Sequence, residues 1–276
     1  MTLCGRPLWA GTLPRPYKGN ETICRIQALS KGGIVNLRGT FAVVTGAAQG
    51  LGYAVSQAYA REGMRIALLD IRGDLLDTLA GELCAKGAEA LPVQVDLSDA
   101  ADTQRAIDAA LTWGGTPRIL VHNAALLIQR SMLEITLEQW QKETNIIVQA
   151  GFQLCKAVWK PMIEAGGGSI VLLTSGSGTR GFIKEIAYCP AKHATEGLMK
   201  SLALEGKEFN IAVNAVTPGA SIHTPMSEQN YDEAGRARWI DPALITEAFV
   251  ELAQQDASGI TGQRIAARVG KLEILT

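Results

Sequence analysis

The chain has 276 residues, of which 47% are hydrophobic and 19% charged, and its formal net charge is −1. A chain of this length fits one large domain or two small ones with a sizeable core, so extensive disorder is not expected. The charge balance argues against nucleic acid or an acidic membrane as a partner, and no run of about 18 apolar residues predicts a membrane span.

The cysteines and histidines exclude two further classes of protein. The five cysteines are odd in number and scattered, with no C-x-x-C pair, so we expect free thiols in a reducing cytosol. The N-terminus lacks the apolar segment of a secretory signal, which favours a cytoplasmic location. The three histidines, His122, His193 and His223, form no H-E-x-x-H pair, and we expect no metal site.

The first 36 residues differ from the rest of the chain. Residues 1–36 contain three prolines and several glycines and show no sustained hydrophobic period, so we interpret them as an extension outside the main fold. Two alternatives remain open. The extension is either a flexible tail or an arm that docks on the body or on a neighbouring subunit through Trp9, Tyr17 and Ile23.

From Thr40 onward, short β-rich runs alternate with helical patterns. The expected strands are Phe41–Thr45, Arg65–Asp70, Ala90–Val95, Arg118–His122, Ser169–Thr174, Ile211–Thr217 and Gln263–Ala267. The first expected helix follows the first strand and ends at about Glu62. The others cover about Gly73–Lys86, Ser98–Trp113, Leu137–Glu164, Tyr188–Glu208 and Ile245–Gln254. The helix at 137–164 is expected to break near its start. The alternation predicts an α/β fold, a doubly wound parallel sheet in one Rossmann-like domain over residues 37–276.

A glycine-rich turn, T-G-A-A-Q-G-L-G, joins the first strand to its helix. Gly46, Gly50 and Gly52 permit a tight turn and let the backbone approach a pyrophosphate. The N-terminus of the following helix supplies N–H donors and a partial positive charge. Since a strand precedes the turn and a helix follows it, the turn predicts a dinucleotide site.

The second strand ends in an acid, Asp70, 24 residues after Gly46. A carboxylate there accepts hydrogen bonds from the adenosine ribose hydroxyls and repels a 2′-phosphate. Gln49, before the middle glycine, adds no positive charge for such a phosphate, whereas the neighbouring Arg72 is a counter-argument. We therefore expect NAD as the cofactor, with NADP as the less favoured alternative.

A tyrosine and a lysine stand four residues apart at the start of a helical pattern. On a helix, Tyr188 and Lys192 share one face, one turn apart. A neighbouring ammonium lowers the pKa of a phenol from about 10, and such a tyrosine can exchange a proton with an alcohol or carbonyl oxygen. Ser175, at the end of the preceding strand, can hydrogen-bond the same oxygen. Taken alone, the spacing also fits a surface Tyr and Lys on an ordinary helix.

Together, these motifs resemble those of the short-chain dehydrogenases/reductases, over about Leu37 to Gly270. The matching segments are the glycine turn (T-G-x-x-x-G-x-G in the family), V-D-L at 95–97, H-N-A-A at 122–125 (N-N-A-G in the family), P-G at 218–219 and I-T-G-Q at 260–263. Ser175 precedes Tyr188 by 13 residues, which is the family's spacing. His122 departs from the family's Asn, and Arg268 stands where the family often has Asp, which puts the usual C-terminal subunit contact in doubt.

The resemblance implies a mechanism. Tyr188 is the general acid/base, and Lys192 lowers its pKa and binds the nicotinamide ribose. Ser175 holds the reacting oxygen, and Asn145 positions a water that links Lys192 to solvent. The residues that the resemblance implies for cofactor binding are Gly46, Gln49, Gly50, Leu51, Gly52, Asp70, Asp96, Leu97, Asn123, Tyr188, Lys192, Pro218, Gly219, Ile222 and Thr224.

The substrate is less defined. Ser177 and Glu185 fall in the loop between Ser175 and Tyr188, and residues 226–239 are expected to cover the site. Arg130 lies in a segment that resembles dehydrogenases of sugar acids such as gluconate, where an Arg could bind a carboxylate. The alternative is a solvated Arg at a helix start.

The leading hypothesis is an oxidoreductase that transfers a hydride between NAD(H) and an alcohol or ketone, with polyols, sugars and sugar acids as candidate small-molecule substrates. Alternatives are a non-catalytic dinucleotide-binding regulator, an NADP-dependent ketone reductase, and an epimerase or dehydratase, although the last usually has a larger C-terminal substrate domain. The helices 137–164 and 188–208 carry apolar residues beyond one core-facing stripe, which predicts a homodimer or homotetramer.

Overall fold

The structure is a computed structural model that describes residues 34–232 and 236–275. Most of the predicted extension, with Trp9, Tyr17 and Ile23, lies outside the described residues. None of the helices in the described ranges is long and apolar enough to cross a membrane.

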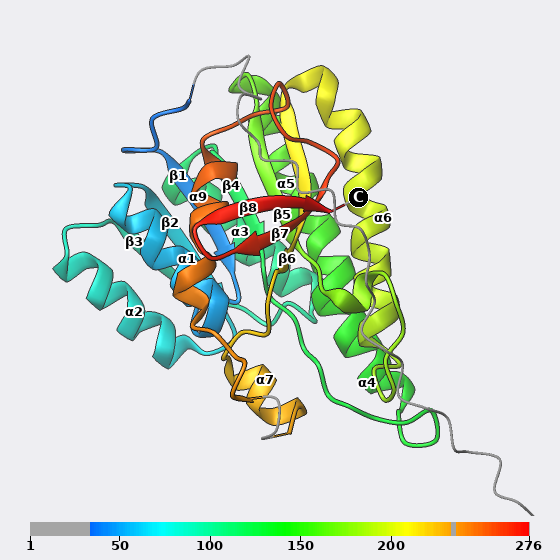
Figure 1. The fold of residues 1–276 in the computed structure, drawn as a ribbon. Coiled ribbons are helices and arrows are strands. Elements are labelled where there is room, and N and C mark those ends of the chain that lie inside the picture. The colour runs from blue at the N-terminus through cyan, green and yellow to red at the C-terminus, as the bar shows by residue number, and fades with distance from the viewer. Residues whose placement is uncertain (1–33, 233–235, 276) are drawn as a thin grey trace, which may run out of the picture.

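Within the described residues, eight strands form one sheet in the order β3-β2-β1-β4-β5-β6-β7-β8, with helices on both faces (Figure 1). The strands are β1 (Phe41–Thr45), β2 (Arg65–Asp70), β3 (Ala90–Gln94), β4 (Ile119–His122), β5 (Gly168–Leu173), β6 (Ile211–Pro218), β7 (Arg264–Arg268) and β8 (Lys271–Leu275). The α-helices are α1 (Gly50–Arg61), α2 (Gly73–Ala85), α3 (Ala100–Gly114), α4 (Leu137–Thr144), α5 (Ala150–Glu164), α6 (Tyr188–Gly206), α7 (Pro225–Asn230) and α9 (Glu247–Ala253). Strands β1 to β7 pair in parallel, which confirms the doubly wound α/β fold.

The last strand, β8, was not predicted, because the sequence after Gly270 was interpreted as a tail. It pairs antiparallel with β7 through a turn in which Gly270 has φ +65°, a conformation that favours glycine. Glu273 on β8 is buried and pairs with Arg268 at 2.7 Å. The unusual arginine of the sequence analysis is therefore held by a strand of its own chain.

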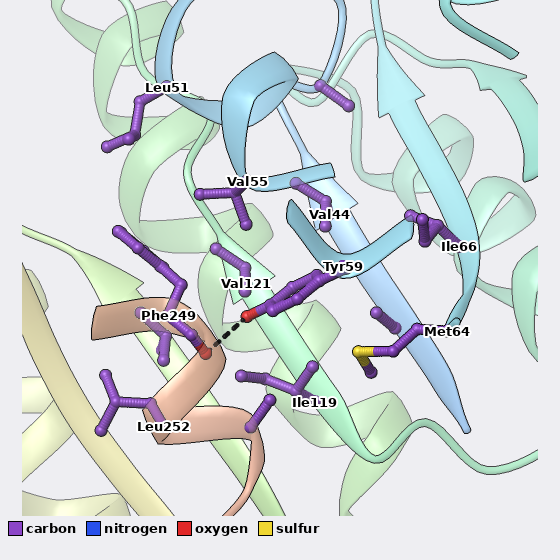
Figure 2. Packing of buried hydrophobic residues seen from close by; sticks show 14 of the residues in the cluster. Val44, Leu51, Val55, Tyr59, Met64, Ile66, Ile119, Val121, Phe249 and Leu252 are labelled. Atoms are coloured by element: carbon purple, nitrogen blue, oxygen red, sulfur yellow. Dashed lines mark hydrogen bonds between the residues drawn. The ribbon is translucent and has the colours of Figure 1, made fainter. Parts of the chain in front are cut away.

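The two faces of the sheet bury separate hydrophobic cores, since successive side chains of a strand point to opposite faces. On β1, Ala42 and Val44 pack with α1, α2 and α9, whereas Phe41 and Val43 pack with α3, α5 and α6. Figure 2 shows the first core, where the buried Tyr59 donates a hydrogen bond to the Phe249 carbonyl at 3.1 Å. This bond ties α1, which carries the glycine turn, to α9.

Candidate active site

A cleft of about 1480 Å³ lies along the carboxyl ends of the strands. Strand β1 lies between β2 and β4, so the chain reverses its direction of winding at this point, and parallel sheets bind ligands at such a reversal. The predicted site residues that line the cleft are Gly46, Gln49, Gly50, Leu51, Asp70, Asp96, Leu97, Asn123, Ser175, Ser177, Tyr188, Lys192, Pro218, Gly219, Ile222 and Thr224. Gly52, Asn145, Arg130 and Glu185 are not among the residues that line it.

The glycine turn needs glycine at each of its three positions. Gly46 and Gly50 have φ +63° and +58°, in the left-handed region. A Cβ on Gly52 would lie 2.0 Å from the Gly46 carbonyl oxygen, so its absence lets α1 pack against the turn. Gly52 therefore shapes the turn from behind the cleft.

The N-terminus of α1 and Asp70 together suit a dinucleotide. Among the described residues, the side chain of Gln49 before α1 makes no capping hydrogen bond, and Gly50 and Leu51 of the first turn line the cleft, so the first N–H groups of the helix are available to a ligand there. Asp70 accepts hydrogen bonds from the backbone N–H of Ala48 and of Arg72, both at 3.0 Å. These bonds hold the carboxylate between the turn and the end of β2.

Asn123 and Thr45 join the glycine turn to β4. The Asn123 side chain donates to the carbonyls of Thr45 and Gly46 at 3.0 and 3.1 Å. The Thr45 hydroxyl accepts from the N–H groups of Asn123 and Ala124 at 3.1 and 3.0 Å. Thr45 was not singled out from the sequence, although it opens the glycine motif.

Ser175 and Tyr188 lie in the same cleft, and the Ser175 hydroxyl donates to the Ser177 hydroxyl at 3.3 Å. Burial is the main reason that the pKa of Tyr188 is raised above its usual value of 10, with smaller contributions from Tyr231 and Glu185. Ser175 acts on this pKa in the opposite direction, since a hydrogen bond from its hydroxyl stabilises the phenolate. In the protein by itself, burial therefore dominates the tyrosine's pKa.

Lys192 lies one turn along α6, with its Nζ 5.4 Å from the centre of the Tyr188 ring. It is 2% exposed and donates to the Leu173 carbonyl at 2.6 Å. Burial lowers its pKa to about 7, and the negative charge of Glu196 opposes this shift. The sequence predicts that Lys192 lowers the pKa of Tyr188, whereas in the protein alone burial raises that pKa.

Asn145 begins a π-helical turn, Asn145–Gln149, between α4 and α5, which confirms the predicted break in the long helix. Its side chain donates to the Ser98 carbonyl at 3.1 Å and thereby ties the turn to the segment after β3.

His122 supports the π-helical turn from β4. Its Nε2 lies 3.1 Å from the Ile147 carbonyl oxygen and its Nδ1 lies 3.0 Å from the Thr45 hydroxyl. Because a carbonyl only accepts, Nε2 carries the proton and Nδ1 accepts from Thr45. A Cβ on Gly151 would lie 3.0 Å from the ring, so this glycine makes room for it. Burial, with a smaller effect of Lys192, lowers the pKa of His122 to about 4.

The substrate side of the cleft contains a hydroxyl–carboxylate cluster. The Ser177 hydroxyl donates to Glu185 at 2.7 Å, and the Tyr231 hydroxyl donates to the same carboxylate at 3.3 Å. Arg130 pairs with Glu185 through the backbone, and its Nε is buried without a hydrogen-bond partner among the described residues. Of the three residues expected on this side, Ser177 lines the cleft, and Glu185 contacts it through Ser177 and Tyr231.

Comparison with known proteins identifies the family. The family model for short chain dehydrogenases matches residues 40–235. The chain belongs to this family. It is 34% identical over 235 residues to a D-threitol dehydrogenase of Mycolicibacterium smegmatis, which covers 82% of this chain and 90% of the relative.

Two solved structures of short-chain dehydrogenases are also similar. One, from Beutenbergia cavernae, is assigned as an NAD(P)-dependent gluconate 5-dehydrogenase with bound NADP, with TM-score 0.78, 29% identity and coverage of 85% of this chain and 97% of that chain. The other is an L-sorbose reductase from Gluconobacter frateurii in complex with NADPH and L-sorbose, with TM-score 0.76, 27% identity and coverage of 87% and 98%.

Sequence reasoning missed one further element of this short-chain dehydrogenase site. Arg264 on β7 forms an ion pair with Glu196 at 3.0 Å and donates to the Ser175 carbonyl at 3.0 Å. Glu196 follows Lys192 by four residues on α6, a spacing visible in the sequence. The partner on β7 could not be found from spacing, because Arg264 lies 68 residues from Glu196.

Proposed function

We propose that this short-chain dehydrogenase uses NAD to oxidise a secondary alcohol of a polyol or related sugar derivative, and reduces the corresponding ketone in the reverse direction. The observation that carries the proposal is that Ser175, Tyr188 and Lys192 lie in one cleft with the uncapped N-terminus of α1. The threitol, gluconate and sorbose names of similar proteins support hydroxylated substrates.

The side chains have distinct parts in this reaction. Ser175 hydrogen-bonds the reacting oxygen and keeps it beside the Tyr188 hydroxyl, which accepts its proton during oxidation. Lys192 in its ammonium form stabilises the phenolate of Tyr188, and Asn145 belongs to the segment through which protons reach solvent. The bound nicotinamide supplies the hydride acceptor.

The residues present fit a nicotinamide dinucleotide. A Cβ at Gly46 would collide with Asn123 and one at Gly52 with the Gly46 carbonyl, so the two glycines keep the turn tight, and the helix N–H groups beside it suit a pyrophosphate. Asp70 suits two ribose hydroxyls and repels a 2′-phosphate, which favours NAD. Arg72 is the counter-charge, yet it pairs with Asp74 at 3.5 Å. The two similar structures contain NADP or NADPH, so cofactor preference is the first point to test.

The test uses both cofactors with a panel of alcohols. We expect NADH to bind more tightly than NADPH in a fluorescence titration, and D-threitol or a related polyol to support NAD reduction measured by absorbance. Better binding of NADPH would overturn the NAD assignment alone. Binding of either cofactor without turnover of any polyol, sugar acid, steroid or acyl ketone would favour a non-catalytic regulator.

We also propose a homodimer in which α5 and α6 of two subunits pack together. Cys155, Val158, Met199 and Ala203 are buried within the subunit, so these residues do not need a partner. Phe152 and Leu204 remain 49% and 80% exposed on the same two helices, and a second copy would cover them. Light scattering should give at least twice the chain mass of 29.4 kDa.

A further inference from the structure

A buried carboxylate lies beside the cleft, and the steps above leave it unused. Glu185 is 3% exposed, and both of its oxygens accept hydrogen bonds from hydroxyl groups. The Ser177 hydroxyl comes from the segment after β5, and the Tyr231 hydroxyl comes from the segment after α7. The Cys189 thiol lies 3.4 Å from the same carboxylate. Three donors from separate segments therefore converge on one group.

The backbone before Glu185 is held in an uncommon conformation. Lys184 has φ 64°, in the left-handed region that side-chain-bearing residues rarely adopt. Its carbonyl accepts a hydrogen bond from the Arg130 N–H at 2.8 Å, and this contact belongs to a parallel bridge between Arg130 and Glu185. Such a conformation persists only where surrounding contacts fix it, which marks the turn as a built feature.

The direction of the hydrogen bonds has a chemical consequence. A carboxylate only accepts, so Ser177 and Tyr231 each give their single hydroxyl proton to Glu185. Both hydroxyls line the cleft together with Ser175 and Tyr188. The Ser177 oxygen also accepts from the Ser175 hydroxyl at 3.3 Å, which leaves one of its two lone pairs. What the two hydroxyls offer a bound molecule is therefore oxygen lone pairs, which recognise a hydrogen-bond donor.

We propose that Glu185 is a specificity-determining residue that selects uncharged substrates carrying a second hydroxyl group beside the reacting carbon, as in a 1,2-diol or polyol. The proposal rests on the proposed function and chooses between its two substrate classes. A sugar acid would bring a carboxylate toward Glu185 and two acceptor oxygens, and like charges repel at close range.

Two arginines bear on whether that repulsion is offset. Arg130, which the sequence analysis assigned to a substrate carboxylate, is not among the residues that line the cleft. Arg180 does line it, with its guanidinium 5.0 Å from the centre of the Phe182 ring. Arg180, with Lys142 and Arg238, which also line the cleft, would bind a carboxylate if the proposal is wrong.

The experiment compares kcat/KM for NAD-linked oxidation of D-threitol, 1,2-butanediol, 2-butanol and D-gluconate by the full-length protein. We expect the wild type to prefer 1,2-butanediol over 2-butanol, by on the order of 10-fold for one well-formed hydrogen bond. In Glu185→Gln the new amide N–H group donates to one of the two hydroxyls, which then turns its own proton into the cleft. The diol preference, which is the ratio of kcat/KM for 1,2-butanediol to that for 2-butanol at one pH, should fall by a similar factor.

A matched control is Glu164→Gln on the exposed end of α5, where the glutamate lies 3.6 Å from the Lys160 ammonium. It should leave the diol preference unchanged. If Glu185→Gln does not fold, Tyr231→Phe removes one of the two hydroxyls from a side chain that is 45% exposed and should lower the same preference.

A second readout separates this role from a structural one. Glu185, Tyr231 and Cys189 raise the pKa of Tyr188, and Ser175 lowers it. Removing the Glu185 charge should therefore move the rise of oxidation rate with pH to lower pH. Equal loss for diol and monoalcohol, or a wild type that prefers gluconate, would overturn the proposal. Absence of turnover with every alcohol would instead overturn the proposed function.

Discussion

The buried ring of His122 makes folding stability depend on pH in a way that can be measured. Its pKa falls from 6.5 to about 4 in the folded protein, chiefly because of burial. In the unfolded chain, the His122 ring therefore binds a proton below about pH 6.5, whereas in the folded protein it stays neutral until about pH 4. This group's contribution to stability is complete above pH 6.5 and is lost as pH falls through that window.

The size follows from the difference between the two pKa values. About 2.5 pH units at 1.36 kcal/mol each give a loss on the order of 3 kcal/mol between pH 6.5 and pH 4. In His122→Asn the shorter side chain cannot reach both Thr45 and Ile147, and one orphaned polar group costs about 1–3 kcal/mol at neutral pH. The variant, however, lacks the titrating ring.

We therefore expect His122→Asn to be less stable than wild type at pH 7.5 and to approach or match it near pH 4. The assay is urea unfolding followed by tryptophan fluorescence at several pH values. Burial raises the pKa of Glu143 to about 7, so the contribution of this group to folding stability is lost as pH rises from about 4.5 to 7. This pH dependence is opposite in sign to that of His122. It is present in both proteins and cancels in the difference.

The control is His193→Asn, which removes an exposed imidazole from α6. A stability difference between His122→Asn and wild type that stays constant from pH 7.5 to pH 4 would refute the assignment of a buried neutral ring. His122→Asn should also lose activity with the cofactor bound, because the π-helical turn that begins at Asn145 loses its contact with β4.

Three further predictions concern the reaction and the cofactor. Tyr188→Phe should lower kcat by on the order of 10²–10⁴-fold, because the phenyl ring keeps the packing but cannot transfer a proton, and turnover within tenfold of wild type would refute this role. Lys192→Met should cripple turnover and move the pH optimum of residual oxidation upward, because the ammonium no longer stabilises the phenolate; an unchanged pH–rate profile contradicts this. Asp70→Ala should narrow the preference for NADH over NADPH in fluorescence titrations, since the carboxylate no longer repels a 2′-phosphate, and an unchanged ratio would count against Asp70.

The fold could be predicted because hydrophobic periodicity and strand ends are local features. The candidate site residues stand at or just after the ends of the apolar runs that form β1, β2, β4 and β5. Because the carboxyl ends of parallel strands meet at one edge of the sheet, these residues could be expected to lie together. Strand β8 was missed because its five residues, K-L-E-I-L, lie at the chain terminus, where the alternation is too short to distinguish a strand from a tail.

The supporting contacts of the site could not be predicted, because they join residues that are distant in sequence. Tyr231 and Glu185 are 46 residues apart, and Thr45 and His122 are 77 apart. No spacing rule relates such positions. Only the register of the sheet, which pairs Thr45 with His122, brings the second pair together. For Arg130, a local resemblance to sugar-acid dehydrogenases suggested that the side chain binds a substrate carboxylate, but Arg130 is not among the residues that line the cleft.

The surroundings of Tyr188 show why a single sequence motif does not determine its reactivity. The Y-x-x-x-K spacing identifies one charge, the ammonium of Lys192, which favours the phenolate. The structure adds a second charge of opposite sign, Glu185, which the sequence analysis considered only for substrate binding and did not connect with the pKa of Tyr188. Burial and the charge of Glu185 both raise the pKa of this phenol, where solvent screens charges less than at a surface. The pH at which this tyrosine accepts a proton is therefore set by the balance between the cofactor side and the substrate side of the cleft, so a change in substrate specificity at Glu185 also changes the pH dependence of the reaction.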